Sequence, residues 1–364
     1  MTCIVVIGNS TGEYDWISPF FKDNSSFDCK LILNEIPEKD KKNIRKDVFL
    51  YPNISIIEPF LLARYFLTFL EKVNRKISLP SSLVSFIYSF FYSKMEIVQT
   101  KFLFQDYSFR KSLLMSHLKK ITTNATLVAF PHAFSLSIPA DCQEDVSHKC
   151  DVVLQNTKLC TRYKAKENII TGIPMLDSLN LFDVLSNNII FFTRDNYDHY
   201  GTTNNACYNK YFQVLDFLES NKLKVYIKHH PRNRKANQRH KDIEKNFNNI
   251  TYINSNNEIP LNKYRACLTF FSAASLMLTR HKVPAIDITP YQEDLLSTSL
   301  IHHLDEDGVY VTPFCEHGLQ SHSLNLNEIM DSKLLGSISQ SQSENSKQIF
   351  PNSYNNALQN LITK

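Results

Sequence analysis

The sequence predicts an α/β protein with two Rossmann-like domains that face each other across a cleft. Short apolar runs typical of buried parallel strands alternate with amphipathic helical segments, first in the N-terminal half and again in the C-terminal half. A break at 181–187 separates the two series, and 364 residues accommodate two domains of ~150 to 200 residues. We expect an N-terminal domain at 1–180, a C-terminal domain at 188–345, and a final helix within 346–364 that returns toward the first domain.

The N-terminal half begins with a β-branched run, Ile4–Ile7, that ends at Gly8 and predicts a buried strand entering a turn. The turn lacks GxGxxG spacing, so a dinucleotide-binding fingerprint is absent. The serine-interrupted apolar segment Leu79–Tyr92 predicts a core helix, with contact to a membrane surface as the alternative. The other expected elements are strands at 30–33, 125–130 and 150–154, a strand from 168 that runs into Gly172, a charged connection at 38–46, helices at 57–75 and 107–120, and a helical or interfacial segment at 86–104.

In the C-terminal half the most informative stretch is Lys222–Lys235. Leu223, Val225 and Ile227 alternate with polar residues and predict a strand with one buried face. Pro231 ends that strand, because proline has no backbone N–H to donate. The other expected elements are strands at 187–193, 250–253, 266–269 and 283–288, helices at 211–221, 272–279 and 354–362, and a flexible Ser/Gln/Asn-rich connector at 337–346.

Composition limits the function classes. The net charge is +4 and the pI is about 8.5, which suits an anionic ligand or lipid surface but is too weak to indicate nucleic acid. The eight cysteines show no CxxC spacing, so we expect reduced thiols, a cytoplasmic protein and no zinc site. The N-terminus lacks signal-peptide features, and no apolar run reaches ~18 residues, so we expect no transmembrane helix.

Polar side chains follow several predicted strands at the carboxyl end, where open α/β sheets bind ligands. After the strand predicted at 266–269, Ser272 occupies a predicted helix N-cap, and Ser275 follows three residues later. Two hydroxyls and the free N–H groups of a helix N-terminus can bind an anion, although an ordinary helix cap is the alternative. Combined with basic residues of the same domain, they predict binding of a nucleotide phosphate and its stabilisation as a leaving group. The predicted phosphate-site residues are Thr193, Arg194, His230, Pro231, Arg232, Ser272 and Ser275.

His132 follows the predicted strand that ends at Phe130, in the first domain. A neutral imidazole at this position can accept the proton of an incoming hydroxyl, since its pKa lies near neutral pH. A structural histidine is the alternative. Glu13, Glu144 and Asp145 are the alternative carboxylate bases.

Five segments, in this order and spacing, resemble the GT-B-fold transferases of bacterial surface polysaccharides. These transferases include CMP-sugar-dependent sialyl-, polysialyl- and Kdo-transferases, and the CDP-glycerol glycerophosphotransferases of teichoic-acid synthesis. The resemblance covers about residues 125–290. The segments are PHA at 131–133, TGIPMLD at 171–177, FTRD at 192–195, KHHPR at 228–232, and TFFSAAS at 269–275 followed by KVPAI at 282–286.

The resemblance implies that His230 and Pro231 contact the phosphate or ribose of a cytidine nucleotide and that Ser272 and Ser275 bind phosphate. It also implies that His132 is the catalytic base. Two positions depart from the family pattern. Ala133 replaces the glycine after the histidine, and Phe270-Phe271-Ser272-Ala273 replaces the Asp-Tyr-Ser-Ser of glycerophosphotransferases, which favours a CMP-sugar donor.

We therefore expect a glycosyltransferase that moves a sialic acid- or Kdo-like sugar from a CMP-activated donor to a saccharide hydroxyl in capsule or lipopolysaccharide synthesis. The expected partners are a nucleotide sugar and an oligosaccharide or glycolipid acceptor, and neither a metal nor a cofactor is expected. The protein is expected in the cytoplasm, with peripheral contact at the inner face of the membrane as an option. The alternatives are a CDP-glycerol-dependent glycerophosphotransferase, a UDP-sugar 2-epimerase and a non-catalytic carbohydrate-binding protein.

Overall fold

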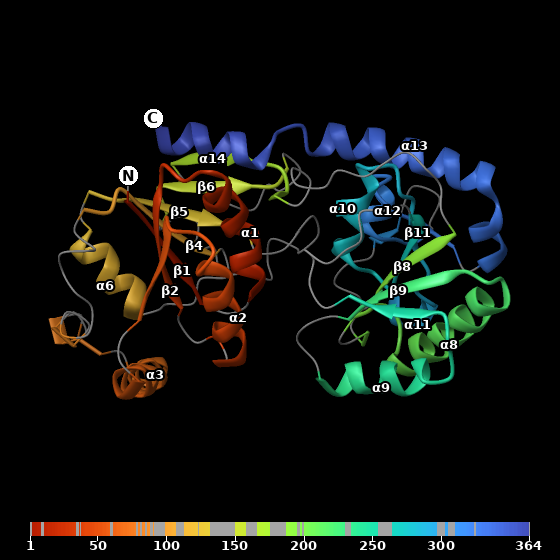
Figure 1. The fold of residues 1–364 in the computed structure, drawn as a ribbon, viewed down its shortest axis with the longest axis horizontal. Coiled ribbons are helices and arrows are strands. Elements are labelled where there is room, and N and C mark those ends of the chain that lie inside the picture. The colour runs from red at the N-terminus through yellow and green to blue at the C-terminus, as the bar shows by residue number, and fades with distance from the viewer. Residues whose placement is uncertain are drawn as a thin grey trace. The chain divides into compact units, whose positions relative to one another are not determined.

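The chain forms two compact units, one containing β1–β7 and α14 and the other containing β8–β15 and α13 (Figure 1). Each unit is built on a parallel sheet, so the prediction of two Rossmann-like α/β domains is confirmed. Residues 181–186 of the predicted linker lie outside the described part of the chain. The computed structural model describes residues 2–8, 11–33, 36, 38–58, 61–77, 79–80, 82–83, 86–87, 90, 99–106, 113–122, 124–131, 150–157, 166–174, 187–194, 197–198, 200–229, 234–253, 264–296, 303–304, 310–323 and 325–363.

The first unit has a seven-stranded parallel sheet in the order β3-β2-β1-β4-β5-β6-β7. The strand order reverses between β1 and β4, which makes their carboxyl ends the switch point of this sheet. Five of the six residues of β1 are buried, as expected for a strand covered on both faces. Its elements are β1 (Thr2–Ile7), α1 (Thr11–Asp23), β2 (Asp28–Leu33), α2 (Glu38–Val48), β3 (Ile54–Ile57), α3 (Leu61–Lys76), β4 (Phe102–Asp106), α6 (Leu113–Ile121), β5 (Thr126–Phe130), β6 (Val152–Gln155), β7 (Glu167–Ile170) and α14 (Tyr354–Thr363).

The C-terminal helix α14 packs on the first unit, against α1 (Figure 1). Trp16 and Tyr354 meet edge to face with ring centroids 6.3 Å apart. The Asn352 side chain donates to the Ile170 carbonyl over 2.7 Å. Gly172 has a φ of +74°, and a Cβ there would lie 2.3 Å from the Asn352 carbonyl oxygen. The predicted return of the C-terminal helix to the first domain is therefore confirmed.

The second unit has a six-stranded parallel sheet in the order β10-β9-β8-β11-β12-β15, with its switch point between β8 and β11. A separate antiparallel pair joins β13 and β14. Its elements are β8 (Asn188–Phe192), α8 (Asn204–Ser220), β9 (Lys224–Lys228), α9 (Arg234–Glu244), β10 (Ile250–Tyr252), β11 (Tyr264–Thr269), the 3₁₀ helix η4 (Ala273–Ser275), α10 (Leu276–Thr279), β12 (Ala285–Asp287), α11 (Glu293–Leu296), β13 (His303–Leu304), β14 (Tyr310–Val311), α12 (Pro313–Glu316), β15 (Ser321–His322), η5 (Leu326–Met330) and α13 (Ser332–Ile349).

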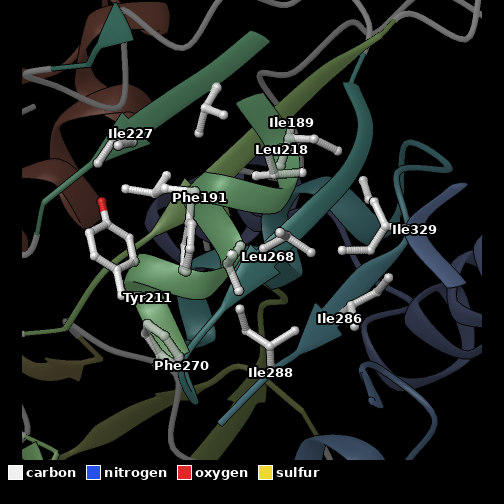
Figure 2. Close-up of a cluster of buried hydrophobic side chains, with 14 of the residues drawn as sticks. Ile189, Phe191, Tyr211, Leu218, Ile227, Leu268, Phe270, Ile286, Ile288 and Ile329 are labelled. Atoms are coloured by element: carbon white, nitrogen blue, oxygen red, sulfur yellow. The ribbon is translucent and has the colours of Figure 1, made fainter. Parts of the chain in front are cut away.

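The core of the second unit lies between this sheet and the helices that cover it (Figure 2). Phe191 on β8 contacts Tyr211 on α8 and Phe270 after β11, with ring centroids 4.9 and 5.3 Å apart. Leu268 and Ile286 continue the cluster across β11 and β12. Because these strands are buried on both sides, their continuous apolar runs could be recognised in the sequence.

Three sequence-based expectations are wrong. The charged segment at 38–46 is the helix α2, in which Lys41, Ile44 and Val48 recur at helical spacing and are buried. The segment at 86–104, expected to be helical or interfacial, is helical at 86–87 and 90, but the expectation fails at its end, where β4 begins and inserts between β1 and β5. The Ser/Gln/Asn-rich stretch at 337–346 lies within the helix α13 and is not a flexible connector.

Hydrogen bonds explain why the polar stretch in α13 is helical and partly buried. Ser339 and Ser343 donate to the carbonyls of Lys282 and Arg280, over 2.7 and 3.2 Å. Arg280 is the C-cap of α10 and Lys282 lies two residues beyond it, so neither carbonyl is part of the hydrogen-bond pattern of that helix. Gln342 accepts from the Ala285 N–H over 2.7 Å and donates to its carbonyl over 2.9 Å. The serine and glutamine side chains thus satisfy buried backbone groups of the second unit.

None of the helices in the described part of the chain combines the length and apolar character that crossing a membrane requires.

Candidate functional site

The candidate site lies at the switch point of the second sheet. β8 pairs with β9 on one side and β11 on the other, so the segments after β8 and β11 leave the sheet at its carboxyl edge on either side of this point. Thr193 and Arg194 follow β8, and Phe271 and Ser272 follow β11. This is the edge at which open α/β sheets bind ligands.

Arg194 links the two strand ends. Its Nη1 donates to the Phe271 carbonyl over 2.5 Å, and its guanidinium carbon lies 3.7 Å from the centroid of the Tyr200 ring. Its backbone N–H donates to the Tyr197 hydroxyl over 3.2 Å. Since a guanidinium carries five N–H donors, one bond to a carbonyl leaves capacity to bind an anion.

A chain of hydrogen bonds joins three side chains near the carboxyl edge of the sheet. They are Thr193 after β8, His229 after β9 and Glu244 on α9. The Thr193 hydroxyl lies 3.1 Å from His229 Nδ1, and His229 Nε2 lies 3.3 Å from Glu244 Oε2. A carboxylate accepts, so His229 donates to Glu244 from Nε2, and its Nδ1 pairs with the Thr193 hydroxyl. Tyr211 donates to the other oxygen of Glu244 over 2.6 Å. These contacts fix the imidazole plane of His229 at the end of β9.

Glu244 is buried, with 2% of its surface exposed. Burial raises the pKa of this carboxyl, but hydrogen bonds from His229, Tyr211 and Tyr252 together with the charge of His229 lower it, and the net pKa lies below its usual value of 4.5. Glu244 is therefore an ionised acceptor at neutral pH, held by three donors.

Ser272 and Ser275 differ in what their hydroxyls can still bind. Ser272 is half-buried and caps η4, its Oγ accepting from the Ala274 N–H over 3.3 Å. Ser275 is fully buried. Its hydroxyl donates to the Ser272 carbonyl over 2.9 Å and accepts from Gln320 Nε2 over 2.6 Å. The Ser275 proton is thus used inside the protein, and its contact with the Ser272 carbonyl holds the η4 turn.

Phe271 adopts a left-handed backbone conformation, with a φ of +41°, which is strained for a residue with a side chain. Its N–H donates to the buried Asp287 carboxylate over 3.1 Å, and its ring stacks on Phe314 at 5.3 Å. Asp287 also accepts from the hydroxyls of Thr289 and Tyr291. The network holds the conformation that directs the Phe271 carbonyl to Arg194.

The structure brings together four of the predicted phosphate-site residues, Thr193, Arg194, Ser272 and Ser275, on neighbouring strand ends of one sheet. Their binding roles stay predictions. The other residues predicted for catalysis or phosphate binding lie outside the described part of the chain, as do two of the alternative carboxylates. These residues are His132, His230, Pro231, Arg232, Glu144 and Asp145.

Glu13, the third alternative base, lies on α1 in the first unit, at the switch point of that sheet. It is fully buried, and its Oε2 accepts from the Gly8 N–H over 2.6 Å. The carboxylate therefore holds the turn after β1, and its role as a base stays a prediction.

Sequence reasoning missed Glu244, His240 and Asp287. Glu244 and His240 lie four residues apart on α9 and are both buried, and the His240 Nε2 contacts the Tyr197 hydroxyl at 2.9 Å. Two ionisable residues at i and i+4 beside the apolar Ile243 are a signal that sequence reasoning could have used. Asp287 is the last residue of β12, whereas the predicted site residues follow the ends of their strands.

Burial raises the pKa of both thiols nearest the Asp287 network, Cys207 and Cys315, to about 12. Both are therefore protonated at neutral pH and are poor nucleophiles. Within the residues that the structure describes, no three His, Cys, Asp or Glu side chains are grouped so that they could hold a metal ion.

Known structures share this fold over nearly the whole chain. A wall teichoic acid polymerase, TagF, with CDPG has a TM-score of 0.56 and 12% identity over 99% of this chain and 86% of that chain. The S. aureus MnaA-UDP structure has a TM-score of 0.54 and 12% identity, over 99% of this chain and 94% of that chain. A glycosyltransferase from Rickettsia africae has a TM-score of 0.51 and 13% identity, over 100% of this chain and 97% of that chain. At these identities the similarity establishes the fold, and it confirms the predicted GT-B architecture.

Among curated protein sequences, none matches this chain significantly. The family model of the alpha-2,8-polysialyltransferases (POLYST) matches residues 26–269, a range that includes β2 to β11 and the segments after β5, β8 and β9 that carry the resemblance. The resemblance to surface-polysaccharide transferases is thereby confirmed, and the chain is a glycosyltransferase that belongs to the alpha-2,8-polysialyltransferase family.

Proposed function

We propose that this protein transfers a sialic acid-like sugar from a CMP-activated donor to a saccharide hydroxyl, in the synthesis of a capsule or lipopolysaccharide. The observation that carries this proposal is the family match over residues 26–269. The departure from Asp-Tyr-Ser-Ser at 270–273 favours the CMP-sugar over a CDP-glycerol donor.

The geometry at the second switch point supports binding of the donor phosphate. Arg194 supplies a positive charge held by Tyr200 and Phe271, and Thr193 and Ser272 carry hydroxyls on the segments that follow β8 and β11. In the reaction the bond between the sugar and the CMP phosphate breaks, and negative charge grows on the phosphate. A fixed guanidinium and hydroxyl donors stabilise that charge in the transition state.

The acceptor hydroxyl forms the new glycosidic bond and gives up its proton. We assign that proton to His132, with Glu13 as the alternative acceptor. His230 and Arg232 complete the contacts to the departing phosphate. In this scheme cationic side chains supply the positive charge, so transfer is expected to proceed without added metal.

The direct test is a transfer assay with the purified chain, CMP-sialic acid and a sialylated oligosaccharide acceptor, read out as CMP release and as added mass on the acceptor. Parallel reactions use CDP-glycerol and UDP-N-acetylglucosamine, and one set contains EDTA. We expect transfer from CMP-sialic acid alone, unaffected by EDTA. Transfer of glycerophosphate from CDP-glycerol, or epimerisation of the UDP-sugar, would replace the proposal by the corresponding alternative.

His132→Ala and His230→Ala separate the two proposed roles. Both are expected to lower transfer by about 100-fold or more, but only His230→Ala is expected to weaken binding of CMP. Full activity of both variants would remove these residues from the mechanism and leave Glu13, Glu144 and Asp145 to be tested as the base.

A further inference from the structure

The helix α3 of the first unit has an unusual outer face. The inner face of α3 packs on the core of this unit, because Leu67 and Leu70 are buried in a hydrophobic cluster with residues of β1 and β4. The opposite face should be polar in a surface helix. Tyr65 and Phe69 lie on it instead, with 68% and 62% of their surface exposed.

Four of the exposed residues on α3 form one stripe, which we call the α3 stripe and define as Tyr65, Phe69, Lys72 and Lys76. Their spacing of i, i+4, i+7 and i+11 places them on one side of the helix. All four are exposed. The α3 stripe therefore starts with two aromatic rings and ends with two lysines.

Exposed apolar side chains are concentrated around this stripe. Of the twelve large hydrophobic residues that are exposed in the described part of the chain, seven lie between residues 65 and 90. Ile87 and Leu79 pack on the same cluster as Leu67, so the segment after α3 lies over the same side of the first unit. A concentration of this kind marks an interaction site. The seven are Tyr65, Phe66, Phe69, Ile77, Leu83, Phe86 and Phe90.

We propose that the α3 stripe and the exposed aromatics that follow it dock the protein peripherally on an anionic lipid bilayer. Aromatic rings prefer the boundary between headgroups and acyl chains, and lysines can extend to the phosphates while their stems stay apolar. In sequence α3 contains four basic residues, Arg64, Lys72, Arg75 and Lys76, and one acidic residue, Glu71. That excess of positive charge complements anionic lipid, whereas lysine is depleted at the cores of protein–protein interfaces.

The test is co-sedimentation of the full chain with vesicles of phosphatidylcholine alone and with vesicles that also contain phosphatidylglycerol. We expect binding to the anionic vesicles that weakens as salt is raised. The double variant Tyr65→Ser/Phe69→Ser should bind about 10- to 100-fold more weakly, because two exposed rings no longer enter the interface. Lys72→Gln and Lys76→Gln should each weaken binding roughly fivefold, and only at low salt.

The matched control is Phe49→Ser/Leu50→Ser, two residues after α2 that are 89% and 69% exposed and lie outside α3. This double variant should bind as the unchanged protein does. Thermal unfolding of each variant separates loss of binding from loss of fold. The proposal fails if neither vesicle type binds, if the α3 variant binds as well as the unchanged protein, or if the control is equally weakened. It also fails if sedimentation shows a dimer that the α3 variant dissociates, because the stripe would then contact a second copy of this chain.

Discussion

The guanidinium of Arg194 donates to the carbonyl of Phe271 over 2.5 Å, across the point where the strand order of the second sheet reverses. The bond joins the end of β8 to the end of β11. Phe271 can direct its carbonyl there because Asp287 holds its N–H, in a backbone conformation with a φ of +41°. Arg194 is thereby positioned before any ligand arrives, which is the condition for electrostatic stabilisation at low reorganisation cost.

Replacing Arg194 by lysine tests whether the shape of the cation matters. Lysine keeps the charge but cannot stack flat on Tyr200 while it donates to Phe271. We expect the KM for the donor to rise about tenfold and the free energy of unfolding to fall by about 1 kcal/mol. Steady-state kinetics and thermal melting measure the two effects. The matched control is Arg239→Lys, since Arg239 stacks on Tyr208 at 4.2 Å outside the site. Equal changes in KM in both variants would contradict a donor-binding role for Arg194.

Variants of the two serines after β11 should distinguish a role in donor binding from a role in the stability of the fold. Ser272→Gly removes the half-buried hydroxyl but costs only a few tenths of a kcal/mol of stability, because glycine is tolerated at an N-cap. Its KM for the donor should rise. Ser275→Ala removes a buried hydroxyl that bonds Ser272 and Gln320, so it should lower the free energy of unfolding by about 1 to 2 kcal/mol. A change in KM confined to Ser275→Ala would reverse the two roles.

The sequence allowed prediction of those features that depend on local pattern. β8 and β11 are apolar runs because they are buried, and Thr193, Arg194 and Ser272 could be predicted from their position after these runs. β9 could be recognised because buried and polar residues alternate along it. The features that could not be predicted depend on partners distant in the chain. The partner of His229 is Glu244, on the helix α9, whose apolar residues are Ala236 and Ile243 alone. The burial of Gln342 depends on the backbone of Ala285 at the start of β12, 57 residues away.

Gly172→Ala should loosen the contact between α14 and the first unit. Gly172 has a positive φ, and its new Cβ would lie 2.3 Å from the Asn352 carbonyl oxygen, which backbone movement must relieve. We expect a loss of about 1 to 3 kcal/mol in the free energy of unfolding. Gly336→Ala is the matched control, because Gly336 lies in α13 with nothing within 4 Å of a new Cβ. It should stabilise the protein by about 0.5 to 1 kcal/mol. Urea denaturation compares the two, and destabilisation by both would indicate a general effect of the added methyl group.

Glu244→Gln should remove a contribution to stability that depends on pH. The pKa of Glu244 in the folded protein lies below its usual value of 4.5. The unfolded chain therefore takes up the proton first as pH falls, and the stability contributed by the carboxylate is present above about pH 4.5 and lost as pH falls through the folded pKa. Glutamine has no such transition, and its amide can still accept from Tyr211 but cannot supply a negative charge to His229.

At pH 7 we expect Glu244→Gln to be less stable than the unchanged protein by about 1 to 3 kcal/mol, because a buried charge-assisted network is broken. Urea denaturation at a series of pH values should show this difference shrinking as the medium is acidified below about pH 4.5. Asp242→Asn is the control on the same helix, since Asp242 is exposed and its low pKa comes from hydrogen bonds with Lys245 and Gln238. Solvent screens those contacts, so its effect on stability should be small at every pH. A constant difference between Glu244→Gln and the unchanged protein from neutral to acid pH would mean that Glu244 acts through packing, and that its charge does not position His229.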